Sequence, residues 1–309
     1  MSPDSPEFQA AYPALAEIMA RQLSSFAQHA GYLDRRFRDA SPEDLAFADM
    51  LASRIAAITG DEMDRFCDDY RWLAEAVLEE EIFFRREDRY RLTTFAEANA
   101  AVYSDPVYMT RYMNGLLLSQ LWWRNHTDVM RYFRDRYLPG NRRGARHLEI
   151  GPGHGLFLYF AAMDERTADC SGWDISPASI ERVKATFAAL APETTPNLAL
   201  VDMFEPSNLT FDSLTFSEVL EHLENPQEAL TAIAARLAPG GRAFFNVPVN
   251  SPAPDHITLF RTPEAVVEVI EAAGLLVEDV CFAPTTGASL DRARKMSLAI
   301  STAVIARKP

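Results

Sequence analysis

The sequence of 309 residues is poor in cysteine, in basic residues and in long apolar runs, and each scarcity excludes a class of protein. Cys67, Cys170 and Cys281 are odd in number and far apart, which argues against a disulfide framework or a cysteine-based zinc site. The 30 Lys and Arg residues against 44 Asp and Glu give a formal net charge of −14, which disfavours nucleic-acid and anionic-membrane partners. The amino-terminal stretch lacks the positive charge of a signal peptide, and no apolar run approaches the roughly 18 residues of a membrane span. We therefore expect a cytoplasmic protein with no nucleic-acid or membrane partner.

Glycine is scarce in the first 140 residues, which hold only four of the thirteen glycines. This region has the pattern of successive amphipathic helices, interrupted near residues 40–44, 58–62 and 103–108. Ser41 with Asp44 predicts one helix start, and the run Ser104-Asp105-Pro106 predicts another. We expect residues 1–140 to form an all-helical cap that contributes to substrate binding.

From residue 145 onward, β-rich runs alternate with helical patterns. Strands are expected near 146–150, 170–175, 198–203, 213–218 and 242–248, and helices near 154–163, 177–190, 226–237 and 263–273. This alternation predicts an α/β fold with a parallel sheet that is covered on both faces. Two further runs, 276–283 and 297–307, show no helix between them and predict an antiparallel hairpin at one edge. We expect residues 141–309 to form one Rossmann-like domain with a seven-stranded, mostly parallel sheet.

The first of these runs leads into an unusual concentration of glycine. An apolar stretch ends at Glu149, and glycines follow at alternate positions, 151, 153 and 155. A dinucleotide-binding fingerprint would need its third glycine at position 156, which is Leu156. The stretch instead resembles the first motif of class I S-adenosylmethionine-dependent methyltransferases, in which an acid precedes a Gly-x-Gly-x-Gly turn. The resemblance implies S-adenosylmethionine as cofactor, held here by Glu149, Gly151, Pro152, Gly153 and Gly155.

Later landmarks of the same family follow in order, so that the resemblance covers about residues 145–309. Asp174 matches the acid that holds the ribose hydroxyls of the cofactor, with Ile175 beside it. Asp202 and Met203 match the adenine-side acid and its apolar neighbour. Glu218 opens the run Glu-Val-Leu-Glu-His, whose first Glu faces the cofactor in many members of the family.

Methyl transfer from S-adenosylmethionine requires no universal catalytic residue, because the cofactor carries its own leaving group and the protein mainly positions and desolvates the acceptor. A hydroxyl acceptor generally needs a base, for which His154, His222 and His256 are the candidates, and we expect His256 to be the catalytic one. Tyr108 and Tyr112 are expected to form an aromatic wall beside the cationic sulfur, although such a stripe is also typical of a core between helices. Substrate contacts are expected from Asn246, Asn250, Asp255, Trp122 and His126.

The run Glu-Val-Leu-Glu-His also resembles the metal-binding motif of ubiquinone-biosynthesis O-methyltransferases and small-RNA 2′-O-methyltransferases. Glu218, Glu221 and His222, with His256, offer oxygen and nitrogen ligands that suit a divalent ion. The same run occurs in members of the family that bind no metal, and we expect no catalytic metal here.

These features predict a methyltransferase that acts on a small polar metabolite, such as an amino acid or a thioether, with methionine S-methylation as one candidate. One alternative is an enzyme that cyclises S-adenosylmethionine to azetidine-2-carboxylate and methylthioadenosine. Another is a non-catalytic sensor or scaffold that binds the cofactor. A small molecule is the expected partner, and a homodimer is left open.

Overall fold

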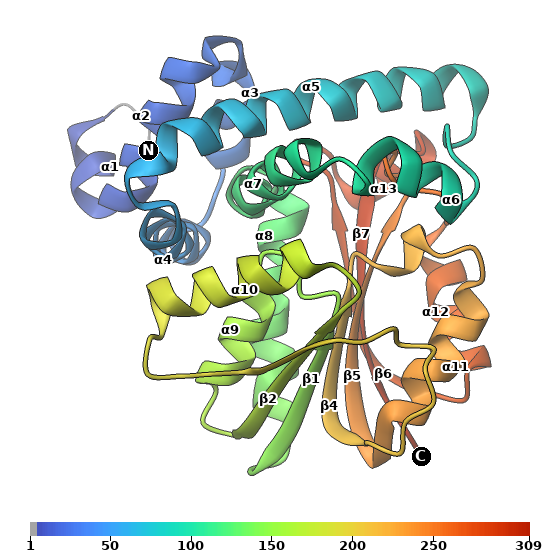
Figure 1. Ribbon diagram of the computed structural model, residues 1–309. Coiled ribbons are helices and arrows are strands. Elements are labelled where there is room, and N and C mark those ends of the chain that lie inside the picture. Colours follow the sequence, from blue (N-terminus) through green and yellow to red (C-terminus); the bar gives the residue numbers. More distant parts are fainter. Residues whose placement is uncertain (1–4) are drawn as a thin grey trace.

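The computed structural model describes residues 5–309, in which a helical region precedes a seven-stranded sheet (Figure 1). In the described part of the chain no strand begins before Ala145. Two π-helical turns, η3 (Asn99–Tyr103) and η4 (Phe133–Tyr137), and three short 3₁₀ turns, η1 (Ala27–His29), η2 (Gly60–Glu62) and η5 (Leu138–Gly140), interrupt the helices. The α-helices are α1 (Pro6–Ala11), α2 (Pro13–Ser25), α3 (Ala30–Phe37), α4 (Pro42–Thr59), α5 (Met63–Glu87), α6 (Phe95–Ala98), α7 (Pro106–Trp122) and α8 (Arg124–Tyr132).

Two helices of this region begin at residues whose side chains cap the free N–H groups of the first turn. Ser41 caps α4, and its side chain forms a reciprocal capping box with Asp44, as predicted. The cap of α7 is Asp105, whose carboxylate accepts from the backbone N–H groups of Val107 and Tyr108. The start of α7 was therefore predicted within one residue, and Asp105 rather than Ser104 supplies the cap.

The strands form one mixed sheet in the order β3-β2-β1-β4-β5-β7-β6. The pairs among the first five strands are parallel, whereas β7 is antiparallel to both β5 and β6. The predicted seven-stranded fold, with its antiparallel carboxyl-terminal pair, is thereby confirmed. The strands are β1 (Ala145–Ile150), β2 (Thr167–Asp174), β3 (Asn197–Leu200), β4 (Phe211–Ser217), β5 (Leu237–Val249), β6 (Leu276–Pro284) and β7 (Ile300–Arg307).

Helices cover both faces of the sheet, with α9 (Leu156–Met163) and α10 (Pro177–Leu190) on one side and α11 (Pro226–Arg236) and α12 (Pro263–Ala272) on the other (Figure 1). Each face has its own buried apolar cluster. A further short helix, α13 (Leu290–Lys295), lies between β6 and β7, so the expectation of no helix there was wrong. Six residues are too few to give a readable amphipathic period, although Ser289 does cap α13.

Buried hydrogen bonds connect the helical region to the sheet. The Asn125 amide on α8 donates to Ser301 Oγ on β7, and the Tyr137 hydroxyl accepts from the Leu214 amide of β4. One apolar cluster contains buried residues of both regions, such as Leu118 of α7 and Phe244 of β5. The hydrophobic core is therefore continuous between the helices and the sheet. The predicted domain boundary near residue 140 marks the change from helix to strand, and it stays a prediction as a boundary between separate folding units.

The long helix α5 and the helix α7 pass across the top of the sheet (Figure 1). Gly115 permits their close approach, because a Cβ at this position would lie 2.8 Å from Leu73 Cβ on α5. Among residues 5–309, each helix is either too short or too polar to cross a membrane.

Candidate functional site

A cavity of about 440 Å³ lies between the helical region and the carboxyl ends of β1, β2, β4 and β5. Ligand sites in doubly wound sheets occupy this edge, where loops from several strands converge. The helical side of the lining comes from α6, η3, α7 and α8, and it includes Asn99, Tyr103, Tyr112, Gln120 and His126.

The glycine turn forms the part of the cavity wall that follows β1. Gly151, Gly153 and Gly155 all have positive φ, at 70°, 51° and 80°, which other residues rarely adopt. At Gly153 an added Cβ would find no atom closer than Met113 Cε at 3.7 Å, whereas at Gly155 it would lie 3.3 Å from Val183 Cα. Gly153 therefore keeps space open in the cavity, and Gly155 serves the packing of the turn against α10.

Two acids lie beside this turn, the buried Glu149 and the half-buried Asp174. Glu149 is 2% exposed, and its Oε2 has no hydrogen-bond partner among the described residues. Burial, and secondly the charge of Asp174, raise the pKa of Glu149 well above its ordinary value. Asp174 accepts hydrogen bonds from the Ser176 amide at 2.8 Å and from Ser179 Oγ at 2.5 Å, and burial raises its pKa as well. An uncompensated carboxylate that is buried beside an open cavity suits a ligand with hydrogen-bond donors or positive charge.

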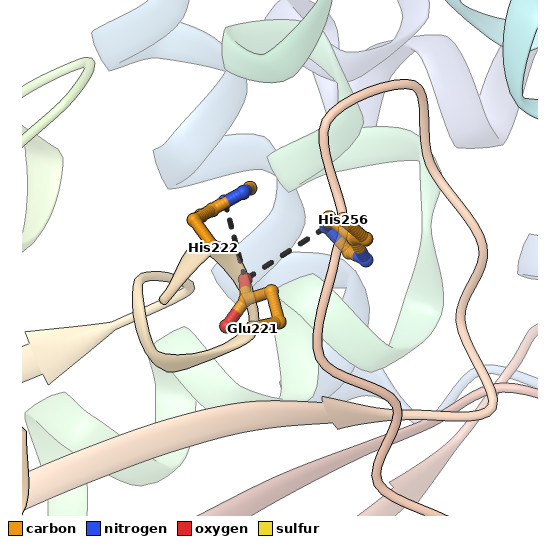
Figure 2. A group of neighbouring side chains, drawn as sticks. All are labelled: Glu221, His222 and His256. Atoms are coloured by element: carbon orange, nitrogen blue, oxygen red, sulfur yellow. Dashed lines mark ion pairs between the residues drawn. The ribbon is translucent and has the colours of Figure 1, made fainter. Parts of the chain in front are cut away.

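A second group, beyond β4, consists of Glu221, His222 and His256, whose potential ligand atoms all lie within 4.8 Å of one another. Figure 2 shows both imidazoles beside the Glu221 carboxylate, with His222 Nε2 at 3.5 Å and His256 Nε2 at 3.8 Å from Oε1. The loop that carries His256 is held in place because the Ile257 and Thr258 amides donate to the backbone carbonyl of Glu221. Both carboxylate oxygens of Glu221 are buried without a hydrogen-bond partner in the described chain.

Backbone contacts fix the orientation of the two imidazoles. His256 Nδ1–H donates to the Ser251 carbonyl at 2.7 Å, and His222 Nδ1–H donates to the Asp255 carbonyl at 3.1 Å. The ring proton of each neutral imidazole is therefore on Nδ1, and the Nε2 lone pair is free on the side of Glu221. Burial lowers the pKa of His256 to about 4, so that this ring is neutral at pH 7. Burial, and secondly Glu218, raise the pKa of Glu221 well above its ordinary value.

Asp255 connects this group to the helical region. Its carboxylate is 2% exposed and accepts from the hydroxyls of Tyr112 at 2.6 Å and Tyr103 at 3.1 Å. Burial alone would raise the pKa of Asp255, but His222, His256 and the tyrosine hydroxyls outweigh it and lower the pKa. Because α7 and η3 supply the tyrosines, the ionised Asp255 joins the helical region to the loop that bears His256.

Glu218 and Asn246 form the wall between the two groups. Glu218 has a φ of 54° and accepts from Asn246 Nδ2 at 2.8 Å, while Asn246 Oδ1 is left without a partner in the described chain. Burial raises the pKa of Glu218 to about 8. A non-glycine residue with this φ, next to an unpaired buried amide oxygen, is typical of a functional position.

The structure brings most of the predicted site residues to this one cavity. These residues are Glu149, Gly151, Pro152, Gly153, Asp174, Ile175, Glu218, Asn246, Asp255, His256, Tyr112 and His126, together with Glu221 and His222. Their roles remain predictions, because geometry alone places them without showing what they bind.

Six other predicted site residues do not line this cavity, and their roles stay predictions. Trp122 is fully buried, and its indole donates to Gln22 Oε1 in the helical core. Asn250 is buried, and its amide donates to the Arg261 carbonyl. Tyr108 packs edge-on against Trp72, as the alternative interpretation of the aromatic stripe allowed.

The remaining three belong to the cofactor motifs. Gly155 faces α10, as described above. Met203 is buried in the apolar cluster on the α11 side of the sheet. The Asp202 carboxylate accepts from the Phe204 amide in an exposed turn. The predicted contacts of these residues with the cofactor are thus not supported by the cavity in this structure.

Sequence reasoning missed Tyr103, Asn99 and Tyr90. Tyr103 and Asn99 belong to a π-helical turn. The sequence predicted a break between helices at 103–108, which includes Tyr103, and Asn99 lies in the helical pattern before that break. Tyr90 accepts from the Ser251 amide and packs edge-on against His256. Nothing in the sequence marks Tyr90, because it lies in an irregular segment after α5 and meets His256 only in the folded chain.

The cofactor implied by the glycine motif can be tested against this cavity. The orphaned Glu149 oxygen and the open space at Gly153 are features that an internal packing role would not require. Asp174 lies at the end of β2, the position at which an acid can meet ribose hydroxyls. The residues present therefore fit S-adenosylmethionine.

Comparisons with known proteins agree with this geometry. A family model described as "Methyltransferase domain" matches residues 122–280. The ubiquinone biosynthesis O-methyltransferase of Alkalilimnicola ehrlichii is 27% identical over 140 residues, which are 45% of this chain and 51% of that protein. The protein of the same name from Aeromonas salmonicida is 29% identical over 163 residues, 46% of this chain and 67% of that protein.

Among solved structures, the pyocyanin biosynthetic protein PhzM is similar in fold, with a TM-score of 0.52 at 14% identity. That similarity covers 79% of this chain and 72% of PhzM. The chain spans about half the length of the curated relatives it matches.

Proposed function

The chain belongs to the methyltransferase-domain family, and on that premise we propose that it transfers the methyl group of S-adenosylmethionine to a hydroxyl oxygen of a small molecule, with a divalent metal ion held by Glu221, His222 and His256. The family and the mixed seven-stranded sheet confirm the recognition of a class I methyltransferase domain and of S-adenosylmethionine as its cofactor. The acceptor and the metal are parts of the proposal.

The observation that carries the proposal is the pair of oriented imidazoles beside an unpaired carboxylate. Both rings direct a free Nε2 lone pair toward Glu221, because their Nδ1–H groups are bound to backbone carbonyls. Metal-ligating histidines are commonly fixed in this way by a partner on the other ring nitrogen. The site offers one carboxylate and two imidazoles, whose ligand atoms lie within 4.8 Å of one another. Such a mixed set of oxygen and nitrogen ligands suits manganese, iron or zinc better than a site made only of oxygen ligands would.

Different residues along the cavity would bind different parts of the cofactor. S-adenosylmethionine supplies a methyl group on a positively charged sulfur, so the donor needs no activation by the protein. Asp174 would hold the ribose hydroxyls, Gly153 would leave room for the methionine portion, and Glu149 would face its positive charge. The helical region covers this end of the sheet and would exclude water from the methyl group.

A hydroxyl acceptor must lose a proton during transfer, unlike a thioether. A divalent ion at Glu221, His222 and His256 would supply Lewis acidity that lowers the pKa of a bound hydroxyl. This group favours an oxygen acceptor over the thioether that was one expectation from the sequence. The names of the two O-methyltransferase relatives support the same choice. The sequence-based expectation of no metal remains untested.

The test is removal of metal from the purified protein. We expect a chelator to abolish formation of S-adenosylhomocysteine from S-adenosylmethionine with phenolic and vicinal-diol acceptors, and manganese to restore it. Glu221→Gln should weaken manganese binding at least tenfold in a calorimetric titration, because one charged ligand is lost. Glu268→Gln, on the exposed face of α12, is the control and should bind manganese like the wild type. Full turnover in chelator, or equal manganese binding by the two variants, would reject the metal.

A further inference from the structure

Within residues 5–309, the cavity is lined by acidic side chains without cationic lysine or arginine partners. Its lining includes five carboxylates, and among the described residues that line it there is no lysine and no arginine. The carboxylates are those of Glu149, Asp174, Glu218, Glu221 and Asp255. Such a wall suits the sulfonium and ammonium groups of S-adenosylmethionine, but it opposes the carboxylate of the same molecule. That carboxylate needs hydrogen-bond donors, since burying an unpaired charge is costly.

Neutral N–H donors in the cavity come from the helical side. Gln120 on α7 and His126 on α8 both line the cavity and are 6% and 9% exposed. In the loop after β5, Asn246 Nδ2 is already committed to Ser217 and Glu218. Gln120 and His126 are thus buried polar side chains on the side of the cavity opposite the acidic strand ends.

The two side chains are held together at the turn between α7 and α8. Gln120 Nε2 donates to His126 Nδ1 at 3.2 Å and to the Leu116 carbonyl at 3.5 Å, so both of its N–H groups are committed. The proton of the neutral His126 ring is therefore on Nε2, which is left as the free donor. Ser119 Oγ lies 3.1 Å from His126 Nδ1, and the Trp123 ring meets the imidazole edge-on at 4.9 Å between centroids. Thr127 Oγ1 donates to the Gln120 carbonyl at 2.7 Å and fixes the turn itself.

His126 lines the same cavity as Gly153 and His154 of the glycine turn. The methionine portion of the cofactor is expected on that turn, so His126 shares the cavity with the place where the carboxylate would lie. Burial lowers the pKa of His126 to about 3, so the ring is neutral at pH 7.

We propose that the Nε2–H group of His126, in an orientation fixed by Gln120, binds the carboxylate of the cofactor's methionine portion. This inference rests on the proposed function, because it presupposes that S-adenosylmethionine occupies the cavity. It assigns to the helical region a direct part in cofactor binding, where the sequence predicted only a substrate contact for His126.

The test compares two ligands that differ in one group. S-adenosylhomocysteine carries the carboxylate, and S-adenosyl-3-thiopropylamine keeps the adenosine, the sulfur and the amine but lacks the carboxylate. The variant His126→Phe removes the free N–H donor, and Gln120→Leu removes the amide that orients it, both with little change in volume. Their melting temperatures report whether each one folds. Asp174→Asn is the control, because both ligands carry the ribose.

In calorimetric titrations we expect each of the two variants to bind S-adenosylhomocysteine about tenfold more weakly and the decarboxylated ligand within twofold of the wild type. Asp174→Asn should weaken both ligands alike. Equal losses for both ligands in Gln120→Leu and His126→Phe would show a merely structural role and overturn the subsite. Unchanged binding of S-adenosylhomocysteine in both variants would overturn it as well. A wild-type protein that binds neither ligand would instead overturn the proposed function on which the inference rests.

Discussion

At the scale of single residues, Asp255 is the point at which the helical region and the sheet meet. Its buried carboxylate accepts from one tyrosine of α7 and one of η3, and its backbone carbonyl accepts from His222. The sequence suggested either an aromatic wall beside the cofactor or packing in a core between helices for Tyr112. The structure shows a third arrangement, in which the hydroxyl binds a carboxylate of the protein itself.

This arrangement predicts a loss of stability for Tyr112→Phe. The hydrogen bond to an ionised, buried carboxylate should contribute about 2 kcal/mol. We expect the free energy of unfolding, measured in urea, to fall by about that amount. Tyr108→Phe is the matched control, because the Tyr108 hydroxyl makes no hydrogen bond among residues 5–309, and it should change the value by less than about 0.5 kcal/mol. Equal losses in both variants would contradict the role assigned to Asp255.

The glycine motif and the acids at strand ends could be predicted from the sequence because their spacing along the chain is fixed by local backbone geometry. Glu149, Gly153 and Asp174 all line the cavity as expected. Trp122 and Tyr103 show the limit of this reasoning. Both are aromatic residues of the helical region, and only the packing of α7 against its neighbours decides that Trp122 is core and Tyr103 lines the site.

At the scale of elements, the site depends on how α7 begins. The π-helical turn η3 ends just before Asp105, and α7 then carries Tyr112, Met113 and Gln120 along the cavity. The Asp105 cap therefore sets the start of the helix that forms much of the cavity roof.

Loss of this cap should be measurable. Asp105 satisfies two backbone N–H groups of the first turn, and we expect Asp105→Ala to lower the free energy of unfolding by about 1 kcal/mol. Ser104→Ala tests the cap suggested by the sequence and should have an effect below about 0.5 kcal/mol. The opposite ranking in thermal or urea unfolding would show that the cap is misassigned.

Strands and long helices were predictable at this scale, because their periodic patterns extend over enough residues. The helix expected at 177–190 matches α10 (Pro177–Leu190). Short elements were not predictable: α13 and the π-helical turns contain five or six residues, and tertiary contacts rather than period determine them.

At the scale of the whole molecule, buried histidines link stability to pH. His147 is fully buried between β1 and β4, where Nδ1 contacts Ser213 Oγ at 2.8 Å and Nε2 contacts Thr215 Oγ1 at 3.2 Å. Burial lowers its pKa to about 3, whereas an unfolded chain has the ordinary value near 6.5. Between about pH 3 and pH 6.5 this imidazole binds a proton in the unfolded state but not in the folded state. The free energy of unfolding therefore falls as the pH drops below about 6.5.

The contribution of His147 can be isolated with His147→Gln. At pH 7.5 the wild type should be the more stable protein, because the variant loses packing and hydrogen bonds. The difference in free energy of unfolding should shrink by about 2 kcal/mol between pH 7.5 and pH 5.0, since only the wild type has this imidazole to protonate on unfolding. A difference that is independent of pH would refute the assignment of a neutral, buried His147.

The acidic charge of the chain and the cavity of about 440 Å³ together favour a small-molecule acceptor, and the exclusion of nucleic acid and the homodimer stay predictions. The most direct test of the central claim is mass spectrometry of the adenosyl product. S-adenosylmethionine is incubated with the protein, manganese and a panel of phenolic and vicinal-diol acceptors. Methyl transfer predicts S-adenosylhomocysteine, together with an acceptor whose mass has increased by one methyl group. Methylthioadenosine as the product, or S-adenosylmethionine that stays unchanged with every acceptor, would contradict the account.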